Sequence, residues 1–197
     1  MPHKSFKVIV VGRQGAGKTS LIHRLVHSKF DPNYVPTVGI EFQPKDMVVD
    51  QERVQLHIWD TAGQEKFKAL VRCFYHHAIC AVFVYAVNDR SSFNDVPLWV
   101  AEARSSVAPE CGLVLIGAKR DLPREVSHEE GMEAMRRLGL DMFFETSALH
   151  GENVLSSFEL ITRELIQKAV RQNKLARVLI QEVSAFAPQR HDRRCCP

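Results

Sequence analysis

The sequence predicts an α/β fold in which a mostly parallel, six-stranded sheet with one antiparallel edge strand carries helices on both faces. Short apolar runs, which are typical of buried strands, alternate with longer segments of helical periodicity. One early run alternates polar and apolar residues and is joined to the next run by a very short connection, which indicates a hairpin at the sheet edge. In such sheets, ligands bind at the carboxyl ends of the strands.

The elements follow in a regular order. A β-branched run at Phe6 to Val11 predicts the first strand, and an apolar helical period through Leu21, Ile22, Leu25 and Val26 follows a glycine-rich turn. The expected hairpin joins residues 41–50 to residues 54–59 through Gln51 and Glu52. Further strands are expected at 81–86, 113–118 and 142–145, with helices near 92–106, 127–138 and 152–171.

Length and composition indicate one folded domain. A chain of 197 residues, 45% of them hydrophobic, can close one substantial core but divides poorly into two. We expect a domain over residues 1–172 and a flexible tail over 173–197, where the composition changes. The net charge of +3, with acids interspersed among the bases, argues against a nucleic-acid partner.

The sequence carries no apolar run long enough to cross a bilayer, and residues 1–11 lack the processing site of a secretory signal, so we expect a cytosolic body. Cys73, Cys80 and Cys111 lack metal-type spacing and are interpreted as small hydrophobic side chains. His76 and His77 are adjacent in sequence and do not share a helical face, which argues against a metal site there.

The strongest motif is a phosphate-binding loop. Residues 12–19 read G-R-Q-G-A-G-K-T and fit G-x-x-x-x-G-K-[ST] between a predicted strand and a predicted helix. Glycine backbone N–H groups and the positive helix end can surround a phosphate, Lys18 adds a charge, and Thr19 offers a hydroxyl to Mg²⁺. The motif predicts a P-loop NTPase-type fold, but alone it would also suit an ATPase or a small-molecule kinase. The predicted loop contacts are Gly12, Gly15, Ala16, Gly17, Lys18 and Thr19.

A second motif narrows the class. Trp59 is followed by D-T-A-G-Q-E at the end of a predicted strand, where Asp60 can hold a metal ion and Gly63 can meet a γ-phosphate. Together with the phosphate loop this element resembles the Ras superfamily of small GTPases, and residues 38–42 and 54–66 resemble its Rab branch. The similarity covers most of residues 6–170.

The resemblance implies roles for individual residues. Thr37 takes the place of the threonine that closes over Mg²⁺ and the γ-phosphate and relaxes after hydrolysis, so the metal set becomes Thr19, Thr37 and Asp60. Gln64 matches the glutamine that positions water, and Lys18 is its catalytic companion. Ser20 and Tyr34 are expected as further nucleotide contacts.

Base recognition follows the family pattern with one departure. The family motif N-K-x-D reads Ala118-Lys119-Arg120-Asp121 here, so Asp121 can still accept two hydrogen bonds from guanine while the asparagine amide is missing. One lost hydrogen bond is worth about 0.5–1.5 kcal/mol, so we expect weaker or faster-exchanging nucleotide. The run Glu145-Thr146-Ser147-Ala148-Leu149 matches the last family element, in which the backbone N–H at Ala148 meets the guanine oxygen.

Gln14 is a second departure, because relatives usually have a small residue at this position. Its side chain either crowds Gln64 and an arginine supplied by an activating protein, which would slow hydrolysis, or points to solvent without effect. Both readings stay open on the sequence alone.

The tail ends in Arg193-Arg194-Cys195-Cys196-Pro197, which is not a C-a-a-X box. The cysteine pair resembles a Rab prenylation site, in which Cys195 and Cys196 each receive a geranylgeranyl group; two lipids anchor stably, and nearby arginines favour anionic headgroups. Apolar residues recur at helical spacing from Leu175 to Phe186, so an amphipathic extension of the last helix is expected, packing on protein in preference to the bilayer.

The resemblance implies a GTPase that cycles between GTP and GDP on the cytoplasmic side of endomembranes, with an escort-bound cytosolic pool. Its implied partners are an exchange factor, an activating protein, a GDP-dissociation-inhibitor or escort protein, and effectors that bind residues 34–42 and 60–75. Two alternatives stay open, a membrane scaffold impaired in nucleotide binding or hydrolysis, and a P-loop kinase. The kinase would leave the D-T-A-G-Q element and the terminal cysteines unexplained.

Overall fold

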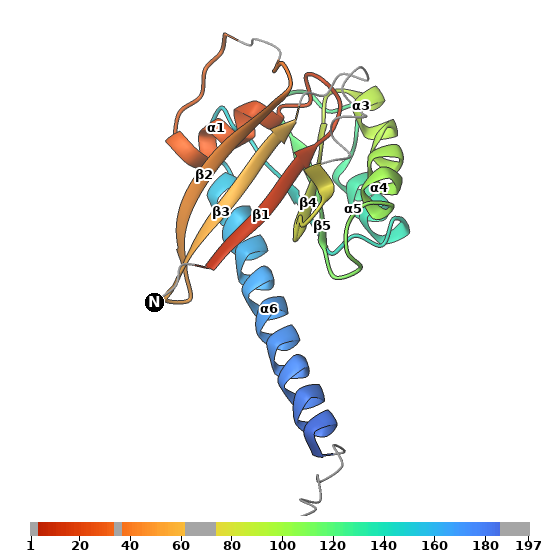
Figure 1. The fold of residues 1–197 in the computed structure, drawn as a ribbon. Coiled ribbons are helices and arrows are strands. Elements are labelled where there is room, and N and C mark those ends of the chain that lie inside the picture. The colour runs from red at the N-terminus through yellow and green to blue at the C-terminus, as the bar shows by residue number, and fades with distance from the viewer. Residues whose placement is uncertain (1–3, 34–36, 62–73, 186–197) are drawn as a thin grey trace, which may run out of the picture. The chain divides into compact units, whose positions relative to one another are not determined.

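The computed structural model describes residues 4–33, 37–61 and 74–185, with the backbone alone over 173–185. Within residues 1–165, which form a compact unit, the strands build one six-stranded sheet in the order β2-β3-β1-β4-β5-β6 (Figure 1). The strands are β1 Lys4–Val11, β2 Ile40–Val49, β3 Glu52–Thr61, β4 Cys80–Ala86, β5 Gly112–Ala118 and β6 Met142–Glu145. The helices are α1 Lys18–His27, α3 Arg90–Asn94, α4 Val96–Arg104, α5 His128–Arg137 and α6 Val154–Ala185.

Strand pairing confirms the predicted fold class. β1 pairs in parallel with β3 and β4, and β4–β5 and β5–β6 are also parallel, whereas β2 pairs antiparallel with β3 at the sheet edge. The hairpin turn lies at Asp50 and Gln51, one residue earlier than expected, and both residues have positive φ angles of 50° and 66°. Two consecutive positive φ angles give a turn whose twist matches that of the flanking strands.

Alternate residues of each strand point to opposite sides of the sheet, and both sides carry apolar residues. One face carries Ile9, Phe83 and Leu115, which belong to a core that α4 completes with Trp99 and Val100. The residues between them, including Val8, Val10 and Ile116, are also buried. Helix α1 supplies Leu21, Ile22 and Leu25 to the interior, and α6 supplies Phe158, Ile161 and Thr162. Central strands covered on both sides therefore read as continuous apolar runs.

A single helix was expected near residues 92–106, and the structure instead has two, α3 and α4, divided at Asp95. The cause is Pro97, which has no N–H to donate within a continuous helix and which stands in the first turn of α4. Asp89 caps α3 by accepting hydrogen bonds from the backbone N–H groups of Ser91 and Ser92.

Helix α6 continues beyond the expected end near residue 171 and reaches Ala185. Residues 166–197 form a second unit, whose described backbone, Ile166 to Ala185, is helical. The helical extension of the last helix is therefore confirmed as far as Ala185. The expected division at residues 172 and 173 stays a prediction. In the described part of the chain, no helix combines the length and hydropathy that a membrane crossing requires.

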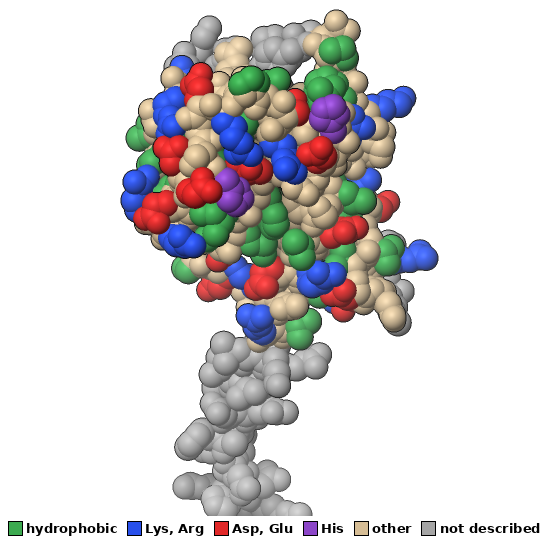
Figure 2. All heavy atoms as spheres, turned by 180° about the vertical axis from the view of Figure 1, so that it is seen from behind, with side chains coloured by type: hydrophobic (Ala, Val, Ile, Leu, Met, Phe, Trp, Pro, Cys, Tyr) green, Lys and Arg blue, Asp and Glu red, His purple; other side chains and the backbone are tan. Residues whose placement is uncertain are grey.

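Basic and acidic side chains are interspersed on the face of the molecule shown in Figure 2, with hydrophobic side chains between them. The described residues also form exposed ion pairs, among them Lys4 with Glu52 and Arg90 with Glu130. Such pairs contribute little stability individually, since solvent screens them.

Gly12 follows β1 directly, at a point where the backbone passes very close to β4. Its φ is +146°, and a Cβ built there would lie 2.1 Å from the backbone oxygen of Val84 in β4. Gly15 also has a positive φ, of +79°, but a Cβ there meets nothing within 4 Å. We expect Gly12→Ala to lower the free energy of unfolding by about 1–3 kcal/mol more than Gly15→Ala, because only the first adds a backbone clash. Urea denaturation without nucleotide measures the difference, and equal losses would contradict this account of the strand spacing.

Candidate functional site

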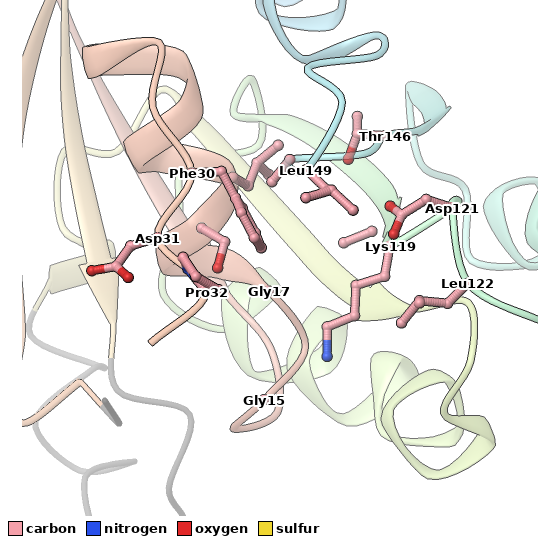
Figure 3. A pocket seen from close by; sticks show the side chains of 14 residues that line it. Gly15, Gly17, Phe30, Asp31, Pro32, Lys119, Asp121, Leu122, Thr146 and Leu149 are labelled. Carbon is pink, nitrogen blue, oxygen red and sulfur yellow. The ribbon is translucent and has the colours of Figure 1, made fainter. Parts of the chain in front are cut away.

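The candidate site lies at the carboxyl edge of the sheet, where the segments after β1, β3, β5 and β6 meet. A cavity of about 370 Å³ opens there, next to a second, smaller hollow of about 20 Å³. Gly15, Gly17 and Ser20 line both spaces, so the two adjoin along the phosphate loop and the start of α1. Figure 3 shows the larger cavity with the side chains that line it.

The N-terminus of α1 has no side-chain cap. Its cap position is Gly17, with a φ of 98°, and no acidic residue lies in the first turn. The contrast within the chain is clear, since Asp89 caps α3 and Ser127 with Glu130 forms a capping box on α5. Uncapped N–H groups at a positive helix end form a binding site for an anion.

Lys18 is buried beside this helix end, with 5% of its surface exposed. Its ammonium donates to the backbone oxygens of Gly12, at 2.8 Å, and Arg13, at 3.0 Å. Burial lowers the pKa of Lys18 from 10.5 to about 8, while the nearby charge of Asp60 acts to raise it. A bound anion would favour the charged ammonium, so the loop is arranged to gain from phosphate.

Asp60 lies at the end of β3, and its Oδ2 accepts a hydrogen bond of 2.6 Å from the hydroxyl of Thr19. The hydroxyls of Thr19 and Thr37 are 2.7 Å apart. Burial raises the pKa of Asp60, whereas the Thr19 hydrogen bond and the charge of Lys18 act to lower it. The other carboxylate oxygen, Oδ1, is buried without a hydrogen-bond partner among the described residues.

This oxygen cluster fits Mg²⁺ better than a transition metal. Mg²⁺ prefers oxygen ligands and is usually held by one or two carboxylates together with water and phosphate oxygens. The described residues contain no group of three or more His, Cys, Asp or Glu side chains that could hold a metal. The site has one carboxylate, with one oxygen that lacks a described partner, and the hydroxyls of Thr19 and Thr37 lie beside it. Such a set would supply some of the ligands of Mg²⁺ and leave the others to water and phosphate.

The larger cavity has the features of a base-binding site. Figure 3 shows the ring of Phe30 on one side and Lys119 and Asp121 on the other, with the Asp121 carboxylate directed inward. An aromatic ring provides a stacking surface for a nucleobase. Lys119 has a positive φ of 61°, and its backbone oxygen accepts from the N–H of Leu122, so a tight turn places Asp121 at the opening.

Ala118 and Thr146 form the inner end of this cavity. Both line it and both are buried, Ala118 with 5% and Thr146 with 1% of its surface exposed. The hydroxyl of Thr146 has no hydrogen-bond partner among the described residues. Gly117 pairs with Glu145, so the residues that follow them, Ala118 and Thr146, are neighbours at the ends of β5 and β6. A Cβ at Gly17 would lie 3.4 Å from the Cβ of Ala118, so Ala118 also lies close to the phosphate loop. A methyl group at position 118 offers no hydrogen bond to either neighbour.

The structure brings together most of the residues expected in the site. Those lining one or both spaces are Gly15, Gly17, Lys18, Thr19, Ser20, Thr37, Lys119, Asp121, Ala148 and Leu149. Gly12 contributes through its carbonyl, and Asp60 through its bond to Thr19. Gln14 is exposed and borders the smaller space.

Other expected residues lie apart from the two spaces or outside the described chain. Ala16 is buried within the phosphate loop and donates to the oxygen of Arg13. Ser147 supports its own loop, because its N–H donates to the oxygen of Glu152 and its hydroxyl accepts from the N–H of His150. Tyr34, Gly63, Gln64, Cys195 and Cys196 lie outside the described residues.

Several lining residues were not predicted as site residues from the sequence. They are Phe30, Asp31 and Pro32, between α1 and β2, together with Leu21, Leu122 and Thr146, of which only Thr146 stands in a family motif. Phe30 is an aromatic residue in the polar connection after a helix, but nothing in the sequence separates it from an ordinary core phenylalanine.

Known proteins with similar sequences identify the class that this fold and site define. The sequence model of the Ras family matches residues 7–167, and the chain belongs to this family of nucleotide-binding small GTPases. Its relatives are Rab proteins. They include Ras-related protein Rab-2B of Dictyostelium discoideum, 40% identical over 83% of this chain and 81% of the relative. Probable Ras-related protein Rab-4A of Echinococcus multilocularis is 39% identical over 83% and 74%, and human Ras-related protein Rab-4B 38% over 83% and 77%.

Glu145, at the end of β6, anchors the segment that leads into the site. It is 8% exposed, and its two oxygens accept 2.7 Å hydrogen bonds from Arg124, with His128 Nδ1 at 3.4 Å. Burial alone would raise the pKa of Glu145, but the hydrogen bonds and charges of Arg124 and then His128 outweigh it and hold the pKa below 4.5. The resulting stability is present above pH 4.5 and is lost as the pH falls through the folded-state pKa.

We therefore expect Glu145→Gln to lower the free energy of unfolding by about 1–3 kcal/mol near neutral pH, since it removes the charge from a buried hydrogen-bonded pair. The difference from wild type should shrink at pH values below 4.5. Urea denaturation across this range measures it. Glu133→Gln is the control, because Glu133 pairs with Arg136 in an exposed contact of 3.9 Å. A difference that does not change with pH would contradict this prediction.

Proposed function

We propose that this Ras-family protein is a Rab-type switch that binds Mg·GTP, hydrolyses it to GDP and acts in intracellular membrane trafficking. One observation carries the nucleotide assignment. The uncapped, positive end of α1 and the buried ammonium of Lys18 face a space that adjoins an aromatic and carboxylate-lined cavity of about 370 Å³. Phosphates belong on the first side and a base on the second, and the trafficking role rests on the relatives being Rab proteins.

In this proposal the chain's own groups do most of the chemistry by positioning. The loop from Gly12 to Gly17 would surround the phosphates, and the ammonium of Lys18 would neutralise part of their charge. The hydroxyls of Thr19 and Thr37 with the carboxylate of Asp60 would hold Mg²⁺. When bound, Mg²⁺ would neutralise charge on the phosphate oxygens. Gln64 would orient the attacking water and Gly63 would contact the γ-phosphate, on the strength of the family resemblance alone.

The base side selects guanine through Asp121. Its carboxylate can accept the two N–H groups at one edge of guanine, whereas adenine offers no matching pair. Phe30 would stack on the base, and the backbone N–H of Ala148 would meet the guanine oxygen. Lys119 would pack its stem on the ring.

Effector binding is proposed at residues 34–42 and 60–75, whose aromatic residues Phe42 and Phe74 both contact Trp59 of β3. Phe42 and Trp59 have ring centres 5.2 Å apart, and Trp59 and Phe74 5.1 Å apart. Phe42 is 43% exposed, so the cluster presents apolar surface. Exchange factor, activating protein and escort are expected partners, and prenylation of Cys195 and Cys196 would hold the protein on endomembranes.

A scaffold that keeps or lacks nucleotide is the second candidate. Two observations favour it, the exposed Gln14 at the border of the phosphate-side space and the missing amide at Ala118. The nucleotide carried by purified protein separates the candidates. GDP supports the cycling enzyme, and GTP or no nucleotide supports the scaffold.

The base assignment is tested by Asp121→Asn. We expect the mutation to weaken GDP binding in the presence of Mg²⁺ by about 10- to 100-fold, the effect of losing a hydrogen bond to a charged group. Xanthosine diphosphate should gain relative to GDP, because an amide N–H suits its additional carbonyl. Asp31→Asn is the control, since Asp31 lines the same cavity but directs its carboxylate away from it in Figure 3. Calorimetry that finds no guanine nucleotide uptake by wild type at millimolar concentration would overturn the proposed function.

Ala118→Asn should restore a partner for the hydroxyl of Thr146 and a bond toward the phosphate loop at Gly17. We expect GDP to dissociate about 3- to 10-fold more slowly, the equivalent of one hydrogen bond. In a Thr146→Val background the gain should be smaller, because the hydroxyl is absent. Release of fluorescently labelled GDP measures both rates. An unchanged or faster release from Ala118→Asn would show that the alanine is not what limits affinity.

A further inference from the structure

Arg24, in the second turn of α1, makes a set of contacts that no motif in the sequence indicates. Its Nε donates to the backbone oxygen of Ala148 at 2.6 Å, and its Nη2 donates to that of Leu149 at 2.8 Å. Its Nη1 donates to the oxygen of Ser28, which ends the same helix, at 2.8 Å. One guanidinium therefore fixes two successive carbonyls of the segment after β6 to the end of α1.

The two carbonyls belong to the wall of the larger cavity. Ala148 and Leu149 both line it, opposite the phosphate loop. Other bonds hold the two residues before them, because the oxygen of Thr146 accepts from the N–H of Arg120 and the N–H of Ser147 donates to the oxygen of Glu152. The carbonyls of Ala148 and Leu149 accept from Arg24. The backbone at this point of the wall is thus held from α1.

The segment also passes close to the stem of Arg24. A Cβ built at Gly151, which has a φ of +76°, would lie 3.7 Å from Cδ of Arg24. A side chain added at Gly151 would therefore meet the arginine. The planar, multidentate guanidinium suits two adjacent carbonyls, whereas a lysine ammonium is a single point of donation.

We propose that Arg24 is a positioning residue for the base-binding wall and that it limits the rate of nucleotide release. The inference rests on the proposed function. Helix α1 carries Lys18 and Thr19 at its first turn and Arg24 further along, so one rigid element fixes the phosphate side and the base side together. Loss of Arg24 leaves the phosphate contacts in place and frees the backbone at Ala148, whose N–H faces the guanine oxygen in the proposed complex.

The test compares nucleotide release from full-length Arg24→Ala, Arg24→Gln and Arg24→Lys with wild type. We expect Arg24→Ala to release labelled GDP about 10-fold faster, equivalent to ~1.4 kcal/mol, with Arg24→Lys intermediate. Arg104→Ala is the matched control. Arg104 also donates to two successive carbonyls, those of Leu138 at 2.5 Å and Gly139 at 3.1 Å, but neither lines the cavity.

A second readout separates positioning from general loosening of the fold. 6-Thioguanosine diphosphate keeps the two N–H groups that face Asp121 but replaces the guanine oxygen with sulfur, a weaker acceptor. If Arg24 positions the N–H of Ala148, the preference for GDP over this analogue falls in Arg24→Ala and Arg24→Gln and is retained in Arg104→Ala. Urea denaturation of the same proteins identifies any variant that fails to fold, and Arg24→Gln then replaces Arg24→Ala.

The outcomes are distinct. Faster GDP release with a reduced preference for the oxygen-containing base supports the proposal. Unchanged release, or faster release with an unchanged preference, overturns it while leaving the proposed function intact. A wild-type protein that takes up no guanine nucleotide overturns the proposed function itself.

Discussion

The arrangement of the site depends on positive charge at the start of α1, where Lys18 is buried with the carboxylate of Asp60 nearby. The N-cap of helix α1 is Gly17, which has no side chain to cap the helix. Lys18 is buried, and its ammonium donates to backbone carbonyl oxygens, which carry no formal charge. Asp89 caps α3 and a full capping box starts α5, whereas α4 also lacks a side-chain cap but has Pro97 in its first turn. Leaving donors unpaired at a buried helix end lowers stability unless a ligand completes them. The start of α1 therefore offers hydrogen-bond donors to an anion.

The proposed metal-binding side also lacks partners, but there the group without a partner is a carboxylate oxygen. Asp60 keeps one buried carboxylate oxygen without a described partner, and burial raises its pKa, so an added cation would favour its ionised form. Thr19 links the two halves, because it belongs to the first turn of α1 and its hydroxyl contacts both Asp60 and Thr37. In the proposed switch, binding of Mg·GTP would thus act on α1, β3 and the segment before β2 together.

The sequence predicted the fold and the phosphate side well, because both depend on local patterns. Apolar runs and helical periods have fixed lengths, and the phosphate loop is a contiguous motif that the structure places between β1 and α1. The base side was predicted only in part. Asp121 and Ala148 stand in short motifs, whereas Phe30 and Arg24 act across the fold through contacts with residues far away in sequence. The division between α3 and α4 was not predicted, because apolar residues continue through this region. Pro97 nevertheless lacks the N–H that a continuous helix would need.

The departure at Ala118 and the contacts of Arg24 bear on the same part of the cavity from opposite sides. The methyl group of Ala118 provides no hydrogen bond between the strand end and the phosphate loop, and the hydroxyl of Thr146 has no partner among the described residues. Arg24 supplies a different link, from α1 to the carbonyls that follow Thr146. Because α1 begins at the phosphate loop, this second route still connects the two halves of the site. A chain with one link missing depends more strongly on the one that remains, so the base wall of this protein should be unusually sensitive to the arginine.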